Sequence, residues 1–293
     1  FGTGVVVGAT MTNQIIFIAL DGLLSGFDAE REALTQEIAQ LQARDIPVIV
    51  FTDRDRAEVE PIREQLGLTA PFITESGSGI FTLVSHNPFD PVLGEKDGDY
   101  YVEILGCPYV QARAGLRVIA NVISHPLKGF GDFTVDQLKR FAKISEEVAH
   151  QAKAREFSEP FMTPKAVEAG TLTQAAEEMG FGVVLRSPEE GRFSELVGAG
   201  AGIVPAIQAL VAAYQNQLPE GEVLQVVGVS DRADDLNALS QAYRQDHQSV
   251  HWAGLVMSPG GEKPVNQLSD DAPGSWLSVA LPLLSSGNPS PLA

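Results

Sequence analysis

Three polar side chains that could take part in catalysis stand directly after short apolar runs far apart in the sequence. They are Asp21, Thr52 and Asp231. A carboxylate can move protons or ligate a divalent cation, and a hydroxyl can donate a hydrogen bond to a bound anion. Asp and Thr are also common in ordinary loops after strands, so the pattern alone leaves a purely structural role open.

The apolar runs before these residues are typical of buried strands. Residues 15–20 (IIFIAL), 47–51 (PVIVF) and 223–229 (VLQVVGV) are the runs in question, and parallel strands covered on both faces have this composition. Helical spacing of apolar residues occurs at about 28–43 and 58–66. The alternation predicts an α/β fold with a Rossmann-like parallel sheet, whose strand ends would bring the three polar residues to one edge.

The middle third of the chain breaks this alternation. After the turn at 75–79, mixed strand and helix patterns end in a pair of segments, 181–185 and 192–197, that resemble exposed strands. The parallel-sheet pattern returns with a helix at 203–214. The expected parts are a core domain at 11–83 and 197–285, an inserted α+β cap domain at 84–196, and flexible ends at 1–10 and 286–293.

Charge and composition exclude several classes of partner. The chain has 20 Lys and Arg against 38 Asp and Glu, a net charge of -18. Such a surface repels nucleic acids and anionic membranes, and the sequence has no apolar run of about 18 residues that would span a bilayer. Cys107 is the single cysteine, which fits a reducing cytoplasm. Residues 1–10 lack the basic start of a signal peptide, and we expect Met11 to be the natural start.

Four short motifs match a known family. Residues 19–23 read ALDGL, 230–235 read SDRADD, 154–161 read AREFSEPF and 129–132 read GFGD. The first two resemble motifs of the haloacid dehalogenase (HAD) superfamily, in the subgroup with a type IIB cap. The last two resemble cap elements of the mannosyl-3-phosphoglycerate phosphatases. The resemblance implies a HAD core with an inserted cap, and a sugar phosphate or phosphorylated sugar acid as ligand.

The resemblance also implies a role for each residue at the expected edge of the sheet. Asp21 takes the place of the family's acid/base, and Thr52 that of the hydroxyl residue that binds the phosphoryl group. Asp231 and Asp235 take the places of the acids that hold Mg²⁺. Ala19 stands where the family has its nucleophilic aspartate, and a methyl group can neither attack phosphorus nor ligate a metal.

Two further departures from the family concern the same centre. Leu23 replaces a threonine, and the family's lysine is missing because no Lys occurs between Lys165 and Lys263. Arg186 or Arg192 could stand in for it only if the cap delivered one of them. Loss of a nucleophile lowers kcat by on the order of 10⁴ to 10⁶. With one anionic ligand absent, we expect weakened Mg²⁺ binding.

The cap motif supplies the candidate substrate-binding residues. Arg155 could pair with a carboxylate or phosphate, while Glu156 and Glu159 could accept sugar hydroxyls or orient Arg155. A salt bridge between Arg155 and Glu159 is the structural alternative.

Three functions therefore stay open. The first is a catalytically impaired homologue that keeps ligand binding or serves as a scaffold. The second is an active Mg²⁺-dependent phosphatase for mannosyl- or glucosyl-3-phosphoglycerate-like phosphomonoesters, working by water attack with Asp21 as base. The third is an interaction protein that presents the fold to a protein partner.

Overall fold

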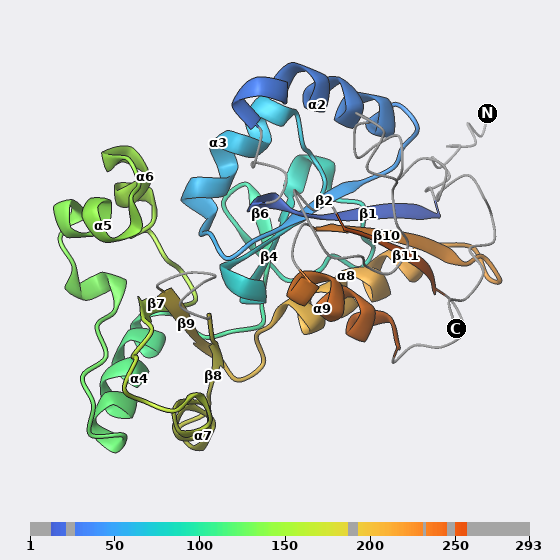
Figure 1. Ribbon diagram of the computed structural model, residues 1–293. Helices are drawn as coiled ribbons and strands as arrows, with labels where there is room; N and C mark the ends of the chain where they lie inside the picture. Colours follow the sequence, from blue (N-terminus) through green and yellow to red (C-terminus); the bar gives the residue numbers. More distant parts are fainter. Residues whose placement is uncertain (1–12, 22–26, 187–192, 231–232, 245–249, 257–293) are drawn as a thin grey trace, which may run out of the picture.

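The chain forms two units, a large sheet covered by helices on both faces and a smaller unit with a sheet of its own (Figure 1). The computed structural model describes residues 13–21, 27–186, 193–230, 233–244 and 250–256. The predicted flexible ends, Leu23, Arg192 and Asp231 lie outside these ranges. No helix within them is both long and apolar enough to cross a lipid bilayer.

The large sheet has eight strands in the described part of the chain, in the order β11-β10-β1-β2-β3-β4-β6-β5. The strands are β1 (Gln14–Ala19), β2 (Val48–Phe51), β3 (Phe72–Thr74), β4 (Gly79–Leu83), β5 (Glu95–Asp97), β6 (Tyr100–Ile104), β10 (Leu224–Ser230) and β11 (Val250–Val256). The first five in the spatial order run parallel, and β4, β6 and β5 are antiparallel to their neighbours. The predicted Rossmann-like parallel sheet is confirmed.

Alternate residues of the central strand β1 face opposite helical layers, as the two-residue repeat of a strand requires. Ile16 and Ile18 pack with apolar residues of α2 (Phe27–Gln42) and α3 (Arg56–Leu66). Ile15 and Phe17 pack with apolar residues of α8 (Ile203–Gln215) and α9 (Ala233–Arg244). The four side chains are at most 1% exposed, which explains why the strand is apolar throughout.

The smaller unit is the cap, drawn green to yellow in Figure 1. Its sheet is antiparallel, in the order β7-β9-β8. Its elements are α4 (Tyr109–Val122), the short helix η3 (Phe130–Asp132), α5 (Val135–Ala142), α6 (Glu146–Gln151), β7 (Glu159–Met162), α7 (Ala169–Glu178), β8 (Phe181–Val184) and β9 (Phe193–Gly198). The predicted strand pair is present, but β9 is buried rather than exposed, because it lies between two other strands.

One part of the predicted domain division is wrong. Residues 84–104 were assigned to the cap, yet β5 and β6 belong to the large sheet, where β6 pairs with β4. The reason is burial, since the ring of Tyr100 packs against the rings of Phe72 and Phe81. The short helices η1 (Glu75–Gly77) and η2 (Val84–His86) flank β4. The other boundaries stay predictions.

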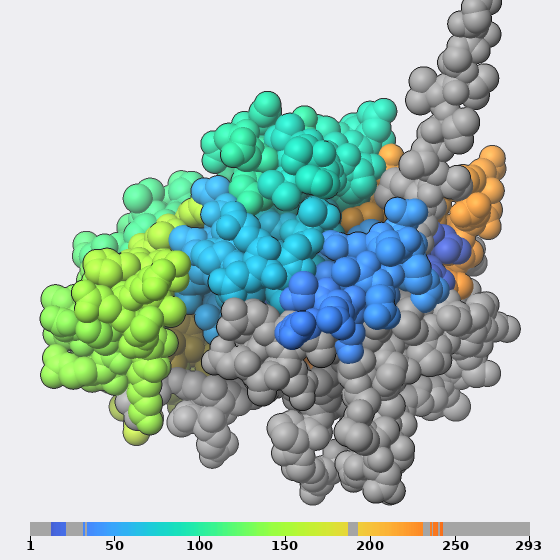
Figure 2. Space-filling model, turned by 90° about the horizontal axis from the view of Figure 1, so that it is seen from above, coloured from blue at the N-terminus to red at the C-terminus, as the bar shows by residue number. Residues whose placement is uncertain are grey.

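The cap is joined to the core by two backbone segments that touch. A Cβ built on Gly198 would lie 2.6 Å from the carbonyl carbon of Gly106, so only glycine fits this crossing. Beyond it, the cap lies against α3 near α6, where the yellow-green part of the surface meets the light blue part in Figure 2.

A second close approach predicts a measurable loss of stability. Gly77 has φ +87°, and a Cβ there would lie 2.1 Å from the carbonyl oxygen of Gly202. We expect Gly77→Ala to cost at least 2 kcal/mol more unfolding free energy than Gly67→Ala, because overpacking adds to backbone strain. Gly67 is the matched control, with φ +65° and nothing within 4 Å of its Cβ position. Urea unfolding monitored by circular dichroism measures both; equal losses would contradict the contact.

Candidate active site

The carboxyl ends of β1 and β2 bring Asp21 and Thr52 together, as predicted. The two strands are parallel neighbours, with Ala19 opposite Phe51. The buried hydroxyl of Thr52 donates a hydrogen bond to Oδ2 of Asp21 at 3.2 Å. The third member of the predicted set, Asp231, lies outside the described residues.

Arg54 completes this group, and the sequence reasoning missed it. Its Nε donates to Oδ1 of Asp21 at 2.9 Å, and its backbone N–H donates to Thr52 Oγ1 at 3.2 Å. Its Nη1 lies 3.4 Å from Oε1 of Glu58 on α3. The available signal was its position two residues after Thr52, at the same strand end.

Two acids at this edge hold protons more readily than usual. Burial raises the pKa of Asp21, the negative charge of Asp53 raises it further, and Arg54 acts in the opposite direction. Burial raises the pKa of Glu58 to about 7, with Asp55 and Asp53 adding to the effect and Arg155 opposing it. A raised pKa lets the carboxyl group of Asp21 hold a proton more readily than an ordinary Asp, which suits an acid/base role.

The position of the expected nucleophile offers no reactive group. Ala19 is the last residue of β1, is 4% exposed and packs among apolar side chains of the α8 and α9 layer. At the end of β10, Ser230 donates to Oδ2 of Asp235 at 2.8 Å. Across the described part of the chain, no three His, Cys, Asp or Glu side chains gather as a metal site would require. The Mg²⁺ site predicted at Asp231 and Asp235 therefore stays a prediction, since Asp231 lies outside the described residues.

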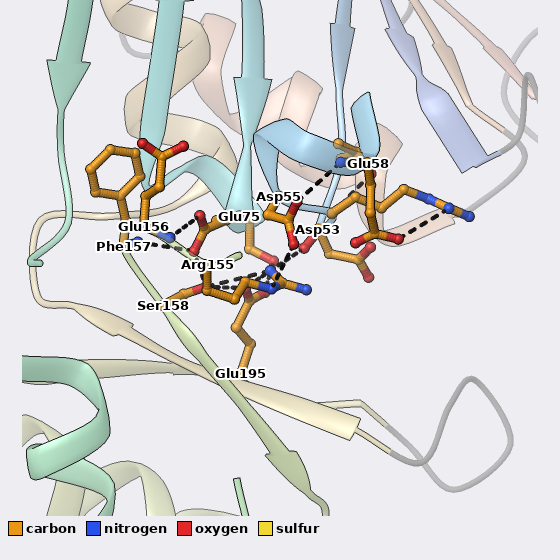
Figure 3. Close-up of polar contacts among 12 residues, drawn as sticks. Asp53, Asp55, Glu58, Glu75, Arg155, Glu156, Phe157, Ser158 and Glu195 are labelled. Atoms are coloured by element: carbon orange, nitrogen blue, oxygen red, sulfur yellow. Dashed lines mark hydrogen bonds and ion pairs between the residues drawn. The ribbon is translucent and has the colours of Figure 1, made fainter. Parts of the chain in front are cut away.

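Arg155 lies buried where the cap meets this edge (Figure 3). Its Nη1 donates to the carbonyl oxygen of Asp53 at 2.6 Å and to Oε1 of Glu195 at 2.9 Å. Its Nε lies 3.8 Å from Oδ2 of Asp55, the residue that caps the N-terminus of α3. The guanidinium therefore links a core loop, a core helix and cap strand β9.

Glu75 binds the segment that follows Arg155. Its carboxylate accepts the backbone N–H groups of Glu156 and Phe157 at 2.8 and 3.1 Å. The hydroxyl of Ser158 lies 2.5 Å from Glu75 and 2.6 Å from Glu195. A hydroxyl donates one proton, so one of these two contacts needs a proton on a carboxyl group. Burial raises the pKa of both Glu75 and Glu195, which favours that protonated form.

The three predicted substrate-binding residues all have protein partners. Arg155 pairs with Glu195 and Asp55, and no salt bridge to Glu159 forms. Glu156 accepts two hydrogen bonds from Arg56, at 2.9 and 3.2 Å. Their substrate contacts stay a prediction.

Glu159 lies apart from this edge, inside the cap. It is fully buried, and its Oε1 accepts the backbone N–H of Gly131 at 2.9 Å. A Cβ on Gly129 would lie 2.1 Å from the same oxygen, so the GFGD motif forms a glycine turn around this carboxylate.

The cap also delivers Arg186 to the edge of the core sheet. Its Nη2 lies 3.0 Å from Oδ2 of Asp53, and its side chain is 17% exposed. From the sequence, an arginine brought to the core by the cap was only an alternative, and Arg186 was one of its two candidates. Sequence reasoning missed the carboxylates that Arg186 and Arg155 contact, because Asp53 lies 133 positions from Arg186 and Glu195 lies 40 positions from Arg155.

The sequence relatives of this chain are named as phosphatases of glucosyl- or mannosyl-3-phosphoglycerate. A glucosyl-3-phosphoglycerate/mannosyl-3-phosphoglycerate phosphatase from Persephonella marina is 28% identical over 260 residues, covering 85% of this chain and 93% of that protein. One of the same name from Methanococcoides burtonii is 28% identical over 254 residues, covering 85% and 86%. A mannosyl-3-phosphoglycerate phosphatase from Pyrococcus furiosus is 33% identical over 147 residues, covering 50% and 59%. No protein-family model matches the chain.

The resemblance to mannosyl-3-phosphoglycerate phosphatases is confirmed. Solved structures agree with it at the level of the fold. A phosphatase of the HAD enzyme superfamily from Bacteroides thetaiotaomicron has a TM-score of 0.53 at 12% identity, covering 82% of this chain and 85% of that one. A protein from Thermoplasma acidophilum has a TM-score of 0.51 at 16% identity, covering 82% and 84%. The predicted HAD core with a cap is thereby confirmed.

The burial of Arg155 predicts a large loss of stability when its charge is removed. We expect Arg155→Met to lower the unfolding free energy by about 3–5 kcal/mol, because the buried carboxylates lose their counter-ion. Arg117→Met is the control, since Arg117 is 66% exposed and 3.6 Å from its acid; its loss should stay within about 1 kcal/mol. Urea unfolding at pH 7 measures both, and similar small losses would show that the cluster does not need its cation.

The raised pKa of Glu58 predicts that the free energy of unfolding depends on pH. The folded state binds its proton up to a pKa of about 7, against 4.5 for an ordinary Glu. Between these values the folded state holds more protons than the unfolded one, so stability falls as pH rises from about 4.5 to 7. Glu58→Gln removes this dependence, and we expect the variant to gain up to about 3 kcal/mol relative to the parent between pH 5 and 8.

The control for this experiment is Glu64→Gln, at an exposed position of the same helix. Urea unfolding at a series of pH values gives the free energies. A difference between Glu58→Gln and the parent that stays flat from pH 5 to 8 would contradict the raised pKa.

Proposed function

We propose that this protein binds a phosphorylated sugar acid of the glucosyl- or mannosyl-3-phosphoglycerate type and releases phosphate from it far more slowly than its relatives do. Ala19 at the end of β1 carries the proposal, because it lies two residues before Asp21 and has no group that could attack phosphorus. The names of the relatives, which align over 85% of the chain, support the ligand class.

The chemistry left at this edge is proton transfer and anion binding. Asp21 can hold a proton that a leaving oxygen needs, and Thr52 and Arg54 fix its carboxyl group. An aspartyl-phosphate cannot form at Ala19, so the two-step covalent route is closed. The lysine that would offset charge in the family is absent between Lys165 and Lys263. Binding can therefore persist where turnover does not.

The proposal includes Mg²⁺ binding, with a lower affinity than in the phosphatases that this chain resembles. Asp231 and Asp235 are the residues that would hold it, and it would offset the charge of the phosphoryl group. Position 19 contributes no carboxylate, and Asp21 is already bonded to Arg54. Fewer anionic ligands leave more of the octahedral shell to water, which weakens the site.

A second candidate function is slow hydrolysis by direct attack of water. The hydrogen bonds that orient Asp21 and the burial that raises its pKa favour it, because a fixed carboxyl group can take a proton from water. This route needs no covalent intermediate, and it depends wholly on Asp21.

Phosphate release by purified proteins separates the two candidates. With glucosyl-3-phosphoglycerate and Mg²⁺, we expect kcat/KM at least about 10⁴-fold below that of the Persephonella marina relative assayed beside it. Ala19→Asp should raise release at least about tenfold, whereas the isosteric control Ala19→Asn should not. Release by the parent within tenfold of the relative, abolished by Asp21→Asn, would refute the impaired enzyme and establish water attack.

Ligand binding is measured separately by calorimetry. The phosphorylated sugar acid should bind more tightly than its dephosphorylated form, since the phosphoryl group supplies the charge-assisted hydrogen bonds. Absence of heat with either compound, and no rise in Tm, would contradict the proposed ligand class.

A further inference from the structure

Two arginines from different units meet at the carboxyl edge of the parallel sheet. Arg54 follows β2 in the core, and Arg186 follows β8 in the cap. Arg54 bonds Asp21, and Arg186 bonds Asp53, the residue next to Arg54 in the chain. Ligands of such sheets bind beyond the carboxyl ends of the strands, so both guanidinium groups stand where a ligand would arrive.

Most of their donors have no partner among the residues that the structure describes. A guanidinium group has five N–H donors. Among the described residues, the side chain of Arg186 makes one hydrogen bond, through Nη2, although it is only 17% exposed. Arg54 uses Nε and Nη1, which leaves Nη2. Donors left unpaired in a partly buried place are costly unless a ligand or water meets them.

The neighbouring arginines differ in this respect. Arg155 is enclosed by Glu195, Asp55 and the Asp53 carbonyl group. Arg56 gives two hydrogen bonds to Glu156 and lies 5.2 Å from the centre of the Phe81 ring. Arg155 also keeps unpaired donors, its Nε among them, but its side chain is only 7% exposed, and the remaining nitrogen of Arg56 lies 3.7 Å from Glu60. Of the four arginines described around this edge, Arg54 and Arg186 combine a nitrogen without a described acidic neighbour with a side chain that is 32% and 17% exposed.

We infer that Arg54 and Arg186 together bind the phosphoryl group of the ligand, one from the core and one from the cap. The inference rests on the proposed function for the rest of the ligand. A guanidinium group can donate two parallel hydrogen bonds to two phosphoryl oxygens. Two guanidinium groups together can balance the two negative charges of a phosphomonoester. Asp21, Asp53 and Glu58 hold the two arginines in place when no ligand is bound.

The charge balance of the site sets the pH at which an anion enters. Arg54 and Arg186 face the acids Asp21, Asp53 and Glu58, and Arg155 and Asp55 also act on Glu58. Burial raises the pKa of Asp21, and that of Glu58 to about 7. Protonation of Glu58 below about pH 7 removes one negative charge beside Arg54. Phosphate affinity should therefore increase as pH falls from 8 to 6.

Because the two arginines come from separate units, an anion that binds both also ties the cap to the core. Arg186 already joins the two units through its pair with Asp53, beside the links that Arg155 and Glu156 make. A phosphoryl group that takes up Arg186 would replace one salt bridge across the interface by several charge-assisted hydrogen bonds. Binding should then protect the interface from proteolysis, and Arg186 should matter for this protection as much as Arg54.

Calorimetric titration with inorganic phosphate and with glucosyl-3-phosphoglycerate tests the inference. Arg54→Gln and Arg186→Gln should each weaken both ligands at least tenfold, and Arg→Lys at the same positions should lose less, since the charge stays. The dephosphorylated compound should bind all variants alike. Arg44→Gln and Arg117→Gln are controls of equal charge change at exposed positions of core and cap, and they should not change affinity by more than about twofold.

The outcomes separate the two proposals. Parent and arginine variants that bind glucosyl-3-phosphoglycerate with equal affinity would overturn the role of the arginines and leave the proposed function intact. A parent that binds neither phosphate compound would overturn both. The Tm of each variant shows whether it is folded, and a variant whose Tm drops is judged by its Lys counterpart. Affinity that does not rise from pH 8 to 6 would contradict the charge balance.

Discussion

A single cation removed from water imposes the arrangement of the interface between core and cap. The guanidinium group of Arg155 needs negative partners from every side, because a buried charge is stable only when it is paired and hydrogen-bonded. The partners come from the loop after β2, the first turn of α3 and cap strand β9. Each of these segments is also next to the edge where Asp21 and Thr52 meet, so the charge that joins the units also fixes the walls of the candidate site.

At the candidate site, the contacts that support Asp21 and seat the cap are separate from position 19, which is an alanine. Thr52 and Arg54 hold the carboxyl group of Asp21, and the cap is seated by Arg155 and by the pair between Arg56 and Glu156. Ala19 is packed with the apolar layer on α8 and α9 rather than with polar groups. The contacts that hold Asp21 and seat the cap thus do not involve Ala19, and for this reason the proposed function separates ligand binding from turnover.

The sequence predicts the core well because local patterns determine it. Continuous apolar runs identify β1, β2 and β10, and the strand ends identify Asp21 and Thr52 as neighbours. Residues 95–104 were misassigned, because antiparallel strands at the edge of a parallel sheet look locally like any other short strand. The roles of Arg155 and Glu195 depend on contacts 40 positions apart, and Arg54 lacked a family motif to mark it. The spacing of residues along the sequence does not predict which acid a given arginine contacts.

The crossing of Gly106 and Gly198 has a consequence for how the two units behave mechanically. Two backbone segments cross there with no room for a side chain between them, so the covalent connection between the units is narrow. Any opening would carry Arg186 and Arg155 along the same arc, so access to the sheet edge and exposure of the buried charge would be one event.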